Sequence, residues 1–146
     1  MRHKYPTVLH VDDEEDIRVI AKLALETIGG LEVIQCESGP EALRLVPKTN
    51  VDLFLLDVMM PEMDGIQTLK LLRKLPGFEH TPAFFMTAKV GSEDKAELLH
   101  CGASAVIPKP FDPMTVAADI VDMWRAEPCT VHPGESYRPG EVHKPT

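Results

Sequence analysis

Five short apolar segments alternate with longer segments of helical periodicity, and this alternation limits the fold more than any other feature of the sequence. Each linking segment is long enough to hold a helix, whereas a hairpin needs only a few residues. Three of the apolar segments are almost continuously apolar, as strands covered on both faces should be. The expected strands are residues 7–11, 31–35, 51–56, 82–86 and 105–107. Repeated strand–helix units of this kind predict a parallel sheet.

Local signals place helices between and after the strands. The first helix is expected over residues 14–28, with Gly29 and Gly30 as its stop. Its expected apolar stripe comprises Ile17, Ile20, Ala21, Ala24 and Ile28. Asp112 and Pro113 give the last helix an N-cap and a first-position proline. Its expected buried stripe comprises Val116, Ala117, Ile120, Val121 and Trp124. Right-handed crossovers then favour a doubly wound α/β fold with five parallel strands, (βα)5.

The sequence changes character after the last expected helix. We expect one domain over residues 1–126 and a flexible, Pro-rich tail over residues 127–146. The prolines of this tail are Pro128, Pro133, Pro139 and Pro145. Because the tail is too short and polar to form a second domain, we expect neither a DNA-binding nor an enzymatic output module.

Charge and composition exclude several classes of protein. Lys and Arg total 15 against 23 Asp and Glu, a net charge of −8, which argues against binding to a nucleic-acid duplex. No apolar run approaches the roughly 18 residues of a membrane span, and the first residues lack the apolar core of a secretory signal. Three widely spaced cysteines suggest neither a disulfide framework nor a zinc site. We therefore expect a reduced, cytoplasmic protein that binds neither nucleic acid nor membrane.

Polar side chains follow four of the five expected strands, at the edge where ligands of parallel sheets bind. They are Asp12, Asp13 and Glu14 after the first strand, Asp57 after the third, Thr87 after the fourth and Lys109 after the fifth. Carboxylates held so close together repel one another unless a cation intervenes, and oxygen ligands suit Mg²⁺. A carboxylate beside Mg²⁺, a lysine and a hydroxyl can accept a phosphoryl group, because charge stabilisation and alignment are most of what that transfer requires. Asp57, alone after the central strand, is the best candidate for the nucleophile.

Each of these residues also has a simpler interpretation. The acids after the first strand could cap a helix, Asp57 and Thr87 could belong to turns, and Lys109 could be a solvated charge. Their joint occurrence at four strand ends favours the functional interpretation. His10 lies within the first strand, where we expect it to serve in core packing.

Four segments carry a strong resemblance to the receiver domain of two-component response regulators. They are Val-Leu-His-Val-Asp-Asp-Glu (8–14), Leu-Leu-Asp-Val-Met-Met-Pro-Glu-Met-Asp-Gly (55–65), Met-Thr-Ala (86–88) and Gly-Ala-Ser-Ala-Val-Ile-Pro-Lys-Pro-Phe (102–111). The resemblance covers about residues 5–125. It implies a flavodoxin-like fold with strand order 2-1-3-4-5, the order of the chemotaxis receiver of this family.

The resemblance implies a role for each residue of the acidic pocket. Asp57 would accept the phosphoryl group from the phosphohistidine of a sensor histidine kinase or phosphotransfer protein. Asp13, Asp57 and the backbone carbonyl of Met59 would bind Mg²⁺, and Asp12 would act mainly through a metal-bound water. The chain would catalyse only its own phosphorylation and autodephosphorylation, so it would be a signalling switch rather than an enzyme.

The resemblance also assigns residues around the acceptor. Thr87 would donate a hydrogen bond to a phosphoryl oxygen, and Lys109, preceding a cis proline, would pair with it. Gly65 and Gly102 would occupy backbone positions that tolerate no side chain. In one departure from the family, Val106 occupies the place of an aromatic ring whose rotamer follows phosphorylation. Valine is too small and stiff to repeat that movement. We therefore expect Thr87 and the loop after it to carry the signal.

Other functions remain open. The expected function is a stand-alone receiver that switches binding to a downstream effector protein, with the helix 4–strand 5–helix 5 face as one route. The alternatives are a phosphorylation-independent interaction module on the same scaffold and an intermediate of a phosphorelay. A flavin-binding protein is disfavoured because Asp12, Asp13 and Glu14 would repel its phosphate. A dedicated phosphatase is disfavoured because Met59 stands where another acid would be expected.

Overall fold

The structure is a computed structural model that describes residues 5–128. Its centre is a five-stranded parallel sheet in the order β2-β1-β3-β4-β5, which confirms the expected fold and strand order. The strands are β1 (Thr7–Val11), β2 (Glu32–Cys36), β3 (Leu53–Asp57), β4 (Ala83–Thr87) and β5 (Ala105–Pro108). Their bounds differ from the predicted ones by at most two residues.

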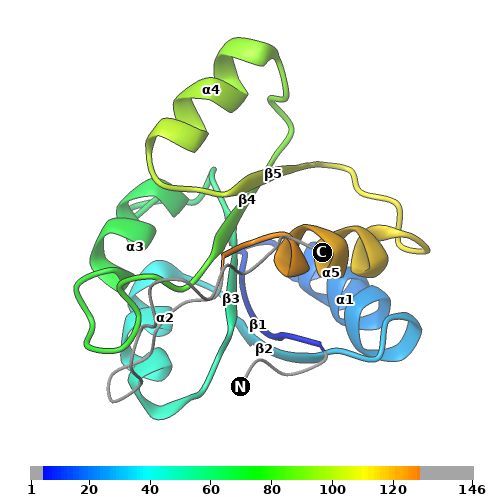
Figure 1. Cartoon of the computed structure of the whole chain (residues 1–146), viewed down its shortest axis with the longest axis horizontal. Helices are drawn as coiled ribbons and strands as arrows, with labels where there is room; N and C mark the ends of the chain where they lie inside the picture. The colour runs from blue at the N-terminus through cyan, green and yellow to red at the C-terminus, as the bar shows by residue number, and fades with distance from the viewer. Residues whose placement is uncertain (1–4, 129–146) are drawn as a thin grey trace, which may run out of the picture.

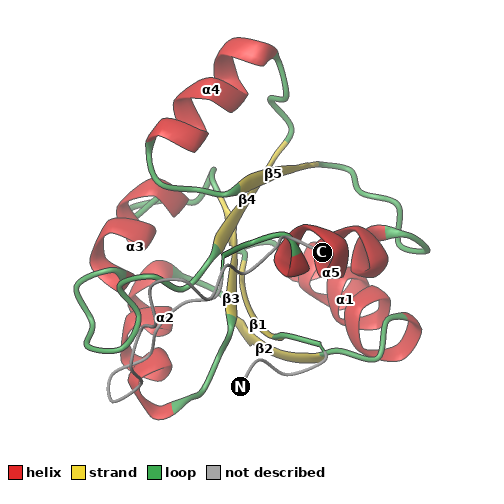
Figure 2. Cartoon of the chain, viewed as in Figure 1, coloured by secondary structure: helices red, strands yellow, loops and turns green. Residues whose placement is uncertain are grey.

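Helices cover both faces of the sheet (Figures 1 and 2). On one side lie α1 (Glu15–Lys22), its π-helical continuation η1 (Leu23–Ile28) and α5 (Val116–Arg125). The other side carries α2 (Gly39–Leu45), the 3-10 turn η2 (Val46–Lys48), α3 (Gly65–Leu72) and α4 (Ser92–His100). In α4 Leu98 alone is buried, and in α1 Ala21 alone is buried.

Alternate strand residues fill two separate apolar layers, as the period of two along a strand requires. Every residue of β3 and β4 is buried, which explains why these two strands read as continuous apolar runs. The layer beneath α2, α3 and α4 includes Leu9, Val11, Phe54, Leu56 and Phe85. The layer beneath α1 and α5 includes Val8, Leu53, Leu55, Phe84 and Met86.

The apolar stripe predicted for the first helix is wrong at two positions. Ile20 and Ile28 are 41% and 42% exposed, whereas Leu25 is buried. Residues 23–28 are wound as a π-helix, in which the N–H of Gly29 donates to the carbonyl of Ala24, five residues back, at 3.0 Å. This wider turn shifts Leu25 and Ile28 around the helix axis, so a stripe drawn at 3.6 residues per turn fails over η1. Ile20 precedes η1 and lies in α1, where Ala21 alone is buried.

The last helix starts later than predicted, but its buried face is confirmed. Helix α5 begins at Val116, and all five residues of the predicted stripe are buried. Asp112 caps a preceding turn instead of the helix, because its Oδ1 accepts the N–H of Met114 at 2.9 Å. The carbonyl of Asp112 accepts the N–H of Thr115 and of Val116, which joins this turn to the helix.

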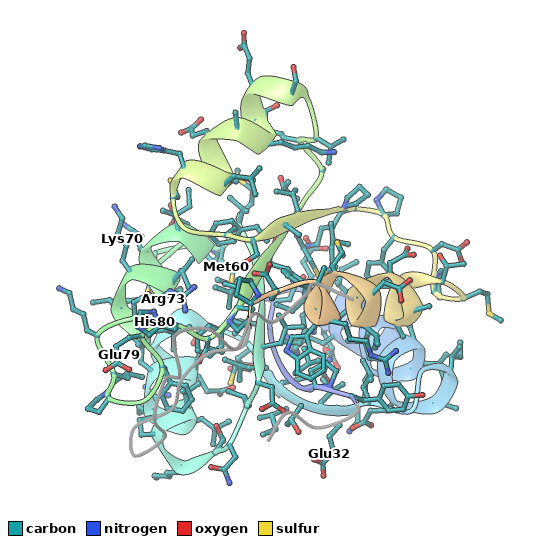
Figure 3. The ribbon with its side chains drawn as sticks, viewed as in Figure 1. Glu32, Met60, Lys70, Arg73, Glu79 and His80 are labelled. Carbon is teal, nitrogen blue, oxygen red and sulfur yellow. The ribbon has the colours of Figure 1, made fainter. Side chains whose placement is uncertain are left out.

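The connection from α3 to β4 is held by a half-buried arginine. Arg73, labelled in Figure 3 beside this loop, donates from Nη1 to the carbonyls of Phe78 and Thr81. Burial lowers the pKa of Arg73 from its ordinary value. Two carbonyls that face inward are thus satisfied by one guanidinium.

The predictions of a flexible tail and of no membrane span concern residues that the structure describes only in part. The predicted tail lies outside the described residues from residue 129 onward, and so does the third cysteine, Cys129. Within residues 5–128, no helix has the length and apolar character needed to cross a membrane.

Candidate functional site

The carboxyl ends of β1 and β3 bring three carboxylates into one pocket. Asp12 follows β1 directly, Asp13 comes next, and Asp57 is the last residue of β3. One carboxylate oxygen from each of these residues lies within 4.8 Å of the other two. Asp12 and Asp57 are buried, whereas Asp13 is exposed. The pocket therefore combines two desolvated acids with a third that solvent reaches.

Lys109 balances the two buried acids. Its Nζ lies 2.9 Å from Oδ2 of Asp12 and 3.2 Å from Oδ1 of Asp57. The Lys109–Pro110 peptide bond is cis, as predicted. Burial acts to lower the pKa of Lys109, but the close contact with Asp12 and the charges of Asp12 and Asp57 outweigh it. The pKa of Lys109 therefore lies above its usual 10.5.

Ionisation of Asp57 remains unfavourable in the folded protein despite the nearby charge of Lys109. Burial, followed by the negative charge of Asp12, raises the pKa of Asp57 from 3.8 to about 6. Lys109 and a backbone hydrogen bond from Met59 act in the opposite direction. A carboxylate whose charge is this poorly compensated is prepared to gain a cation or to be esterified.

Asp12 is fixed by contacts from three directions. Its N–H donates to the carbonyl of Cys36 at 3.1 Å, and its Oδ1 accepts the N–H of Glu14 at 2.9 Å. Arg18 Nη1 donates to its carbonyl at 2.7 Å. These bonds leave Oδ2 as the atom that faces Lys109. Asp12 is therefore held in place before any ligand enters.

The remaining predicted residues surround this pocket. Thr87 ends β4 next to β3, and its Oγ1 accepts the N–H of Lys89 at 3.0 Å. Met59 follows β3 and is 64% exposed, and the ligand role of its carbonyl stays a prediction. Val106 is half-buried in β5 and packs against the core.

Gly65 and Gly102 meet their expected requirements for different reasons. At Gly65 a Cβ would lie 2.3 Å from the carbonyl oxygen of Asp57, which leaves no room for a side chain. At Gly102 there is room, but φ is +108°, a conformation that favours glycine.

Two polar residues behind Asp12, the buried His10 and the half-buried Gln35, extend the site beyond the predicted set. His10 is fully buried, and its Nδ1 lies 3.1 Å from Nε2 of Gln35. Burial, opposed by Asp12 and aided by Lys109 and Arg18, lowers the pKa of His10 to about 4. The sequence spacing could have indicated this position of His10. Residues two apart on a strand point to the same face, so His10 lies on the same side as Asp12.

The fold and the pocket together define a class: doubly wound α/β proteins with a charged site at the carboxyl ends of the strands. Comparison with known proteins gives the family. Residues 8–121 match the family model of the response regulator receiver domain. The chain therefore belongs to the response regulator receiver domain family.

Solved structures agree with this assignment. The chemotaxis response regulator CheY4 of Vibrio cholerae is 32% identical, with a TM-score of 0.75 over 82% of this chain and 98% of that one. The receiver domain of the Francisella response regulator 1452 is 32% identical, with a TM-score of 0.72 over 82% of this chain and 97% of that one.

Relatives by sequence are longer proteins. The transcriptional regulatory protein YvrH of Bacillus subtilis is 38% identical over 78% of this chain and 47% of the relative. The transcriptional regulatory protein SrrA of Staphylococcus aureus is 36% identical over 89% of this chain and 53% of the relative. The chain thus spans about half the length of these two relatives.

Proposed function

We propose that this receiver accepts a phosphoryl group on Asp57 from a sensor histidine kinase or a phosphotransfer protein, and thereby changes its binding to a downstream effector protein. The observation that carries the proposal is the buried Asp57, which shares one pocket with two further carboxylates and Lys109. A separate effector is proposed as the readout, and the cytoplasm as the place of action. No other substrate would be turned over.

The donor set fits a magnesium ion. Three carboxylates supply oxygens within 4.8 Å of one another. Among the described residues, none makes a hydrogen bond of ordinary geometry to Oδ2 of Asp12 or Oδ2 of Asp57. The proposed ligands are Asp13, Asp57 and the carbonyl of Met59, with Asp12 acting mainly through water. The ion would supply positive charge to the carboxylates and to an incoming phosphoryl group.

The protein side chains would divide the remaining work. An oxygen of Asp57 forms the new bond to phosphorus, while the bond from phosphorus to the donor's imidazole nitrogen breaks and its electron pair stays on that nitrogen. Lys109, already 3.2 Å from Asp57, would turn to a phosphoryl oxygen. Thr87 would donate its hydroxyl proton to another. Two charge-assisted bonds of about 1.5–3 kcal/mol each approach the roughly 5.5 kcal/mol needed to reverse a 1:99 equilibrium.

The direct test is phosphorylation by a small donor. With Mg²⁺ and acetyl phosphate, intact mass measurement should show one phosphate on the wild type and none on Asp57→Asn. Asp52→Asn is the matched control, because Asp52 precedes the same strand at its other end, where its Oδ2 accepts the N–H of Thr7. It should gain one phosphate like the wild type. A wild type that stays unmodified would instead favour a phosphorylation-independent interaction module.

The path of the signal gives a second test. Val106 lacks the ring that would move on phosphorylation, so we expect Thr87 and residues 88–91 to change first, followed by α4 and α5. Amide NMR signals of these segments should shift on phosphorylation. Exchange broadening confined to the loop after Asp57, with α4 and α5 silent, would contradict this route.

A further inference from the structure

His10 is a buried imidazole placed directly behind the acidic pocket. Its side chain is fully buried on β1, two residues before Asp12. Its Nε2 lies 4.0 Å from Oδ2 of Asp12, and among the described residues neither atom makes a hydrogen bond of ordinary geometry. A buried ring N–H without such a bond thus faces a carboxylate oxygen that is paired with Nζ of Lys109, 2.9 Å away.

The neighbours of His10 determine which ring nitrogen carries the proton. Gln35 Nε2 donates to the carbonyl of Arg18 at 2.8 Å, which identifies this atom as the amide nitrogen and not the oxygen. The same nitrogen lies 3.1 Å from Nδ1 of His10. Because an amide NH₂ can only donate, Nδ1 must accept, and the proton of the neutral ring resides on Nε2. That N–H faces the carboxylate of Asp12.

The two partners of the Asp12 carboxylate differ in how firmly they are held. Lys109 is 2.9 Å from Oδ2 of Asp12, but it also reaches Asp57 and would turn to a phosphoryl group there. His10 is fixed by the sheet and by Gln35, so it stays where it is. Once Lys109 turns away, a buried carboxylate oxygen needs another donor, and the His10 N–H is the neighbouring group.

The geometry points to His10 as a positioning residue, oriented by Gln35, that donates Nε2–H to Oδ2 of Asp12 and holds this carboxylate when Lys109 turns to the phosphoryl group. The inference rests on the proposed function. Once Lys109 releases Oδ2 of Asp12, a turn of the Asp12 carboxylate toward the fixed imidazole closes the present 4.0 Å to hydrogen-bond distance, roughly 3 Å. His10 touches neither the phosphoryl group nor the cation, and it acts through Asp12, as residues behind metal ligands commonly do.

Two substitutions separate positioning from simple packing. Gln at position 10 places an amide N–H close to the place of the imidazole Nε2, whereas Leu fills similar space without a donor. Mg²⁺ titration in the presence of excess acetyl phosphate, followed by the amide NMR shifts of residues 12–14 and 57–59, should show an affinity about tenfold weaker in His10→Leu. His10→Gln should stay within about twofold of the wild type. If His10 only packs, leucine would bind Mg²⁺ as well as glutamine does, and that result would overturn the inference.

The control variant and a second measurement complete the test. Glu32→Gln alters the exposed start of β2, labelled at the lower edge of Figure 3, and should leave Mg²⁺ affinity unchanged. Nitrogen-15 NMR of the wild-type imidazole should find the proton on Nε2, and a proton on Nδ1 would overturn the inference even if His10→Leu fails to fold. Failure of the wild type to take up phosphate would refute the proposed function itself. Uptake by the wild type with equal Mg²⁺ affinity in both His10 variants would refute the role of His10 alone.

Discussion

Replacing Asp57 by asparagine should raise the free energy of unfolding by about 3 kcal/mol at pH 8 in the absence of divalent cations. The pKa of Asp57 is about 6 in the folded protein, against an ordinary 3.8. Because of burial and the charge of Asp12, the ionised Asp57 destabilises the folded state. Asparagine removes this charge and has nearly the same shape as aspartate. Urea unfolding of both proteins in a chelator should show the difference.

The pH dependence of this gain follows from the sign of the pKa shift. Below about pH 4 the carboxyl is protonated in both states, so the substitution gives no gain. Between about pH 4 and about pH 6 the folded state keeps a proton on Asp57 that the unfolded state has lost, so the contribution of Asp57 to wild-type stability falls as the pH rises, and the stability difference between the two proteins grows. Above that window the difference stays constant. An asparagine variant that is less stable than the wild type at pH 8 would contradict the prediction.

Two controls isolate the pocket from the general acidity of the chain. The net charge is −8, so removing any carboxylate could relieve some repulsion. Asp52→Asn removes one charge at the opposite end of β3 and should not give the gain. Saturating Mg²⁺ should stabilise the wild type and narrow its difference from Asp57→Asn, because only the intact carboxylate set would bind the ion strongly.

Gly65→Ala should destabilise the protein by about 3 kcal/mol or more. A Cβ at this position would lie 2.3 Å from the carbonyl oxygen of Asp57 and 3.0 Å from Cα of Val58. Both are backbone atoms, so they can give way only if the end of β3 moves. The N–H of Gly65 also donates to the carbonyl of Val58 at 3.0 Å, which closes the loop after Asp57. Thermal and urea unfolding would measure the loss.

Gly91→Ala is the matched control for this prediction. Gly91 precedes α4 with φ −62°, an ordinary value for alanine, and the nearest atom to an added Cβ is Oδ2 of Asp94 at 3.2 Å. That atom is the end of a flexible side chain and can move aside, so the loss should be limited to the poorer N-cap that alanine provides, about 1 kcal/mol or less. Equal stabilities of the two variants would show that the contact at Gly65 is not limiting.

The sheet and the carboxylate cluster could be predicted because each depends on repeated, local signals. Continuous apolar runs identify β3 and β4, and the topology of a parallel sheet places Asp12 and Asp57 at one edge whatever the details of packing. The stripe of α5 was readable for the same reason, since one regular helix lies on one face of the sheet. Few folds are compatible with this alternation of apolar strands and helices, which is why these features could be predicted correctly.

The π-helical η1 could not be predicted from local periodicity, and its end packs against another helix. A Cβ at Gly29 would lie 2.3 Å from Cβ of Ala117, so the end of η1 sits directly against α5. This contact joins residues that are far apart in the sequence, and local periodicity carries no sign of it. The exposed Ile28 follows from the altered winding.

The polar contacts behind the pocket escaped prediction for a related reason. Gln35 is an ordinary polar residue on β2, and its effect on His10 appears only when β1 and β2 align His10 opposite Gln35. The orientation of its amide depends in turn on a carbonyl of α1. A register and a tertiary contact must both be known before such a chain of hydrogen bonds can be seen.

The pairing of Asp12 with Lys109 has a consequence for folding. These residues directly follow β1 and β5, and β3 and β4 lie between those strands in the sheet. Contacts of such high contact order form late, after long loops have closed. An incompletely assembled chain would hold its acids without their lysine, so the proposed phosphoryl transfer would require a molecule that has finished folding.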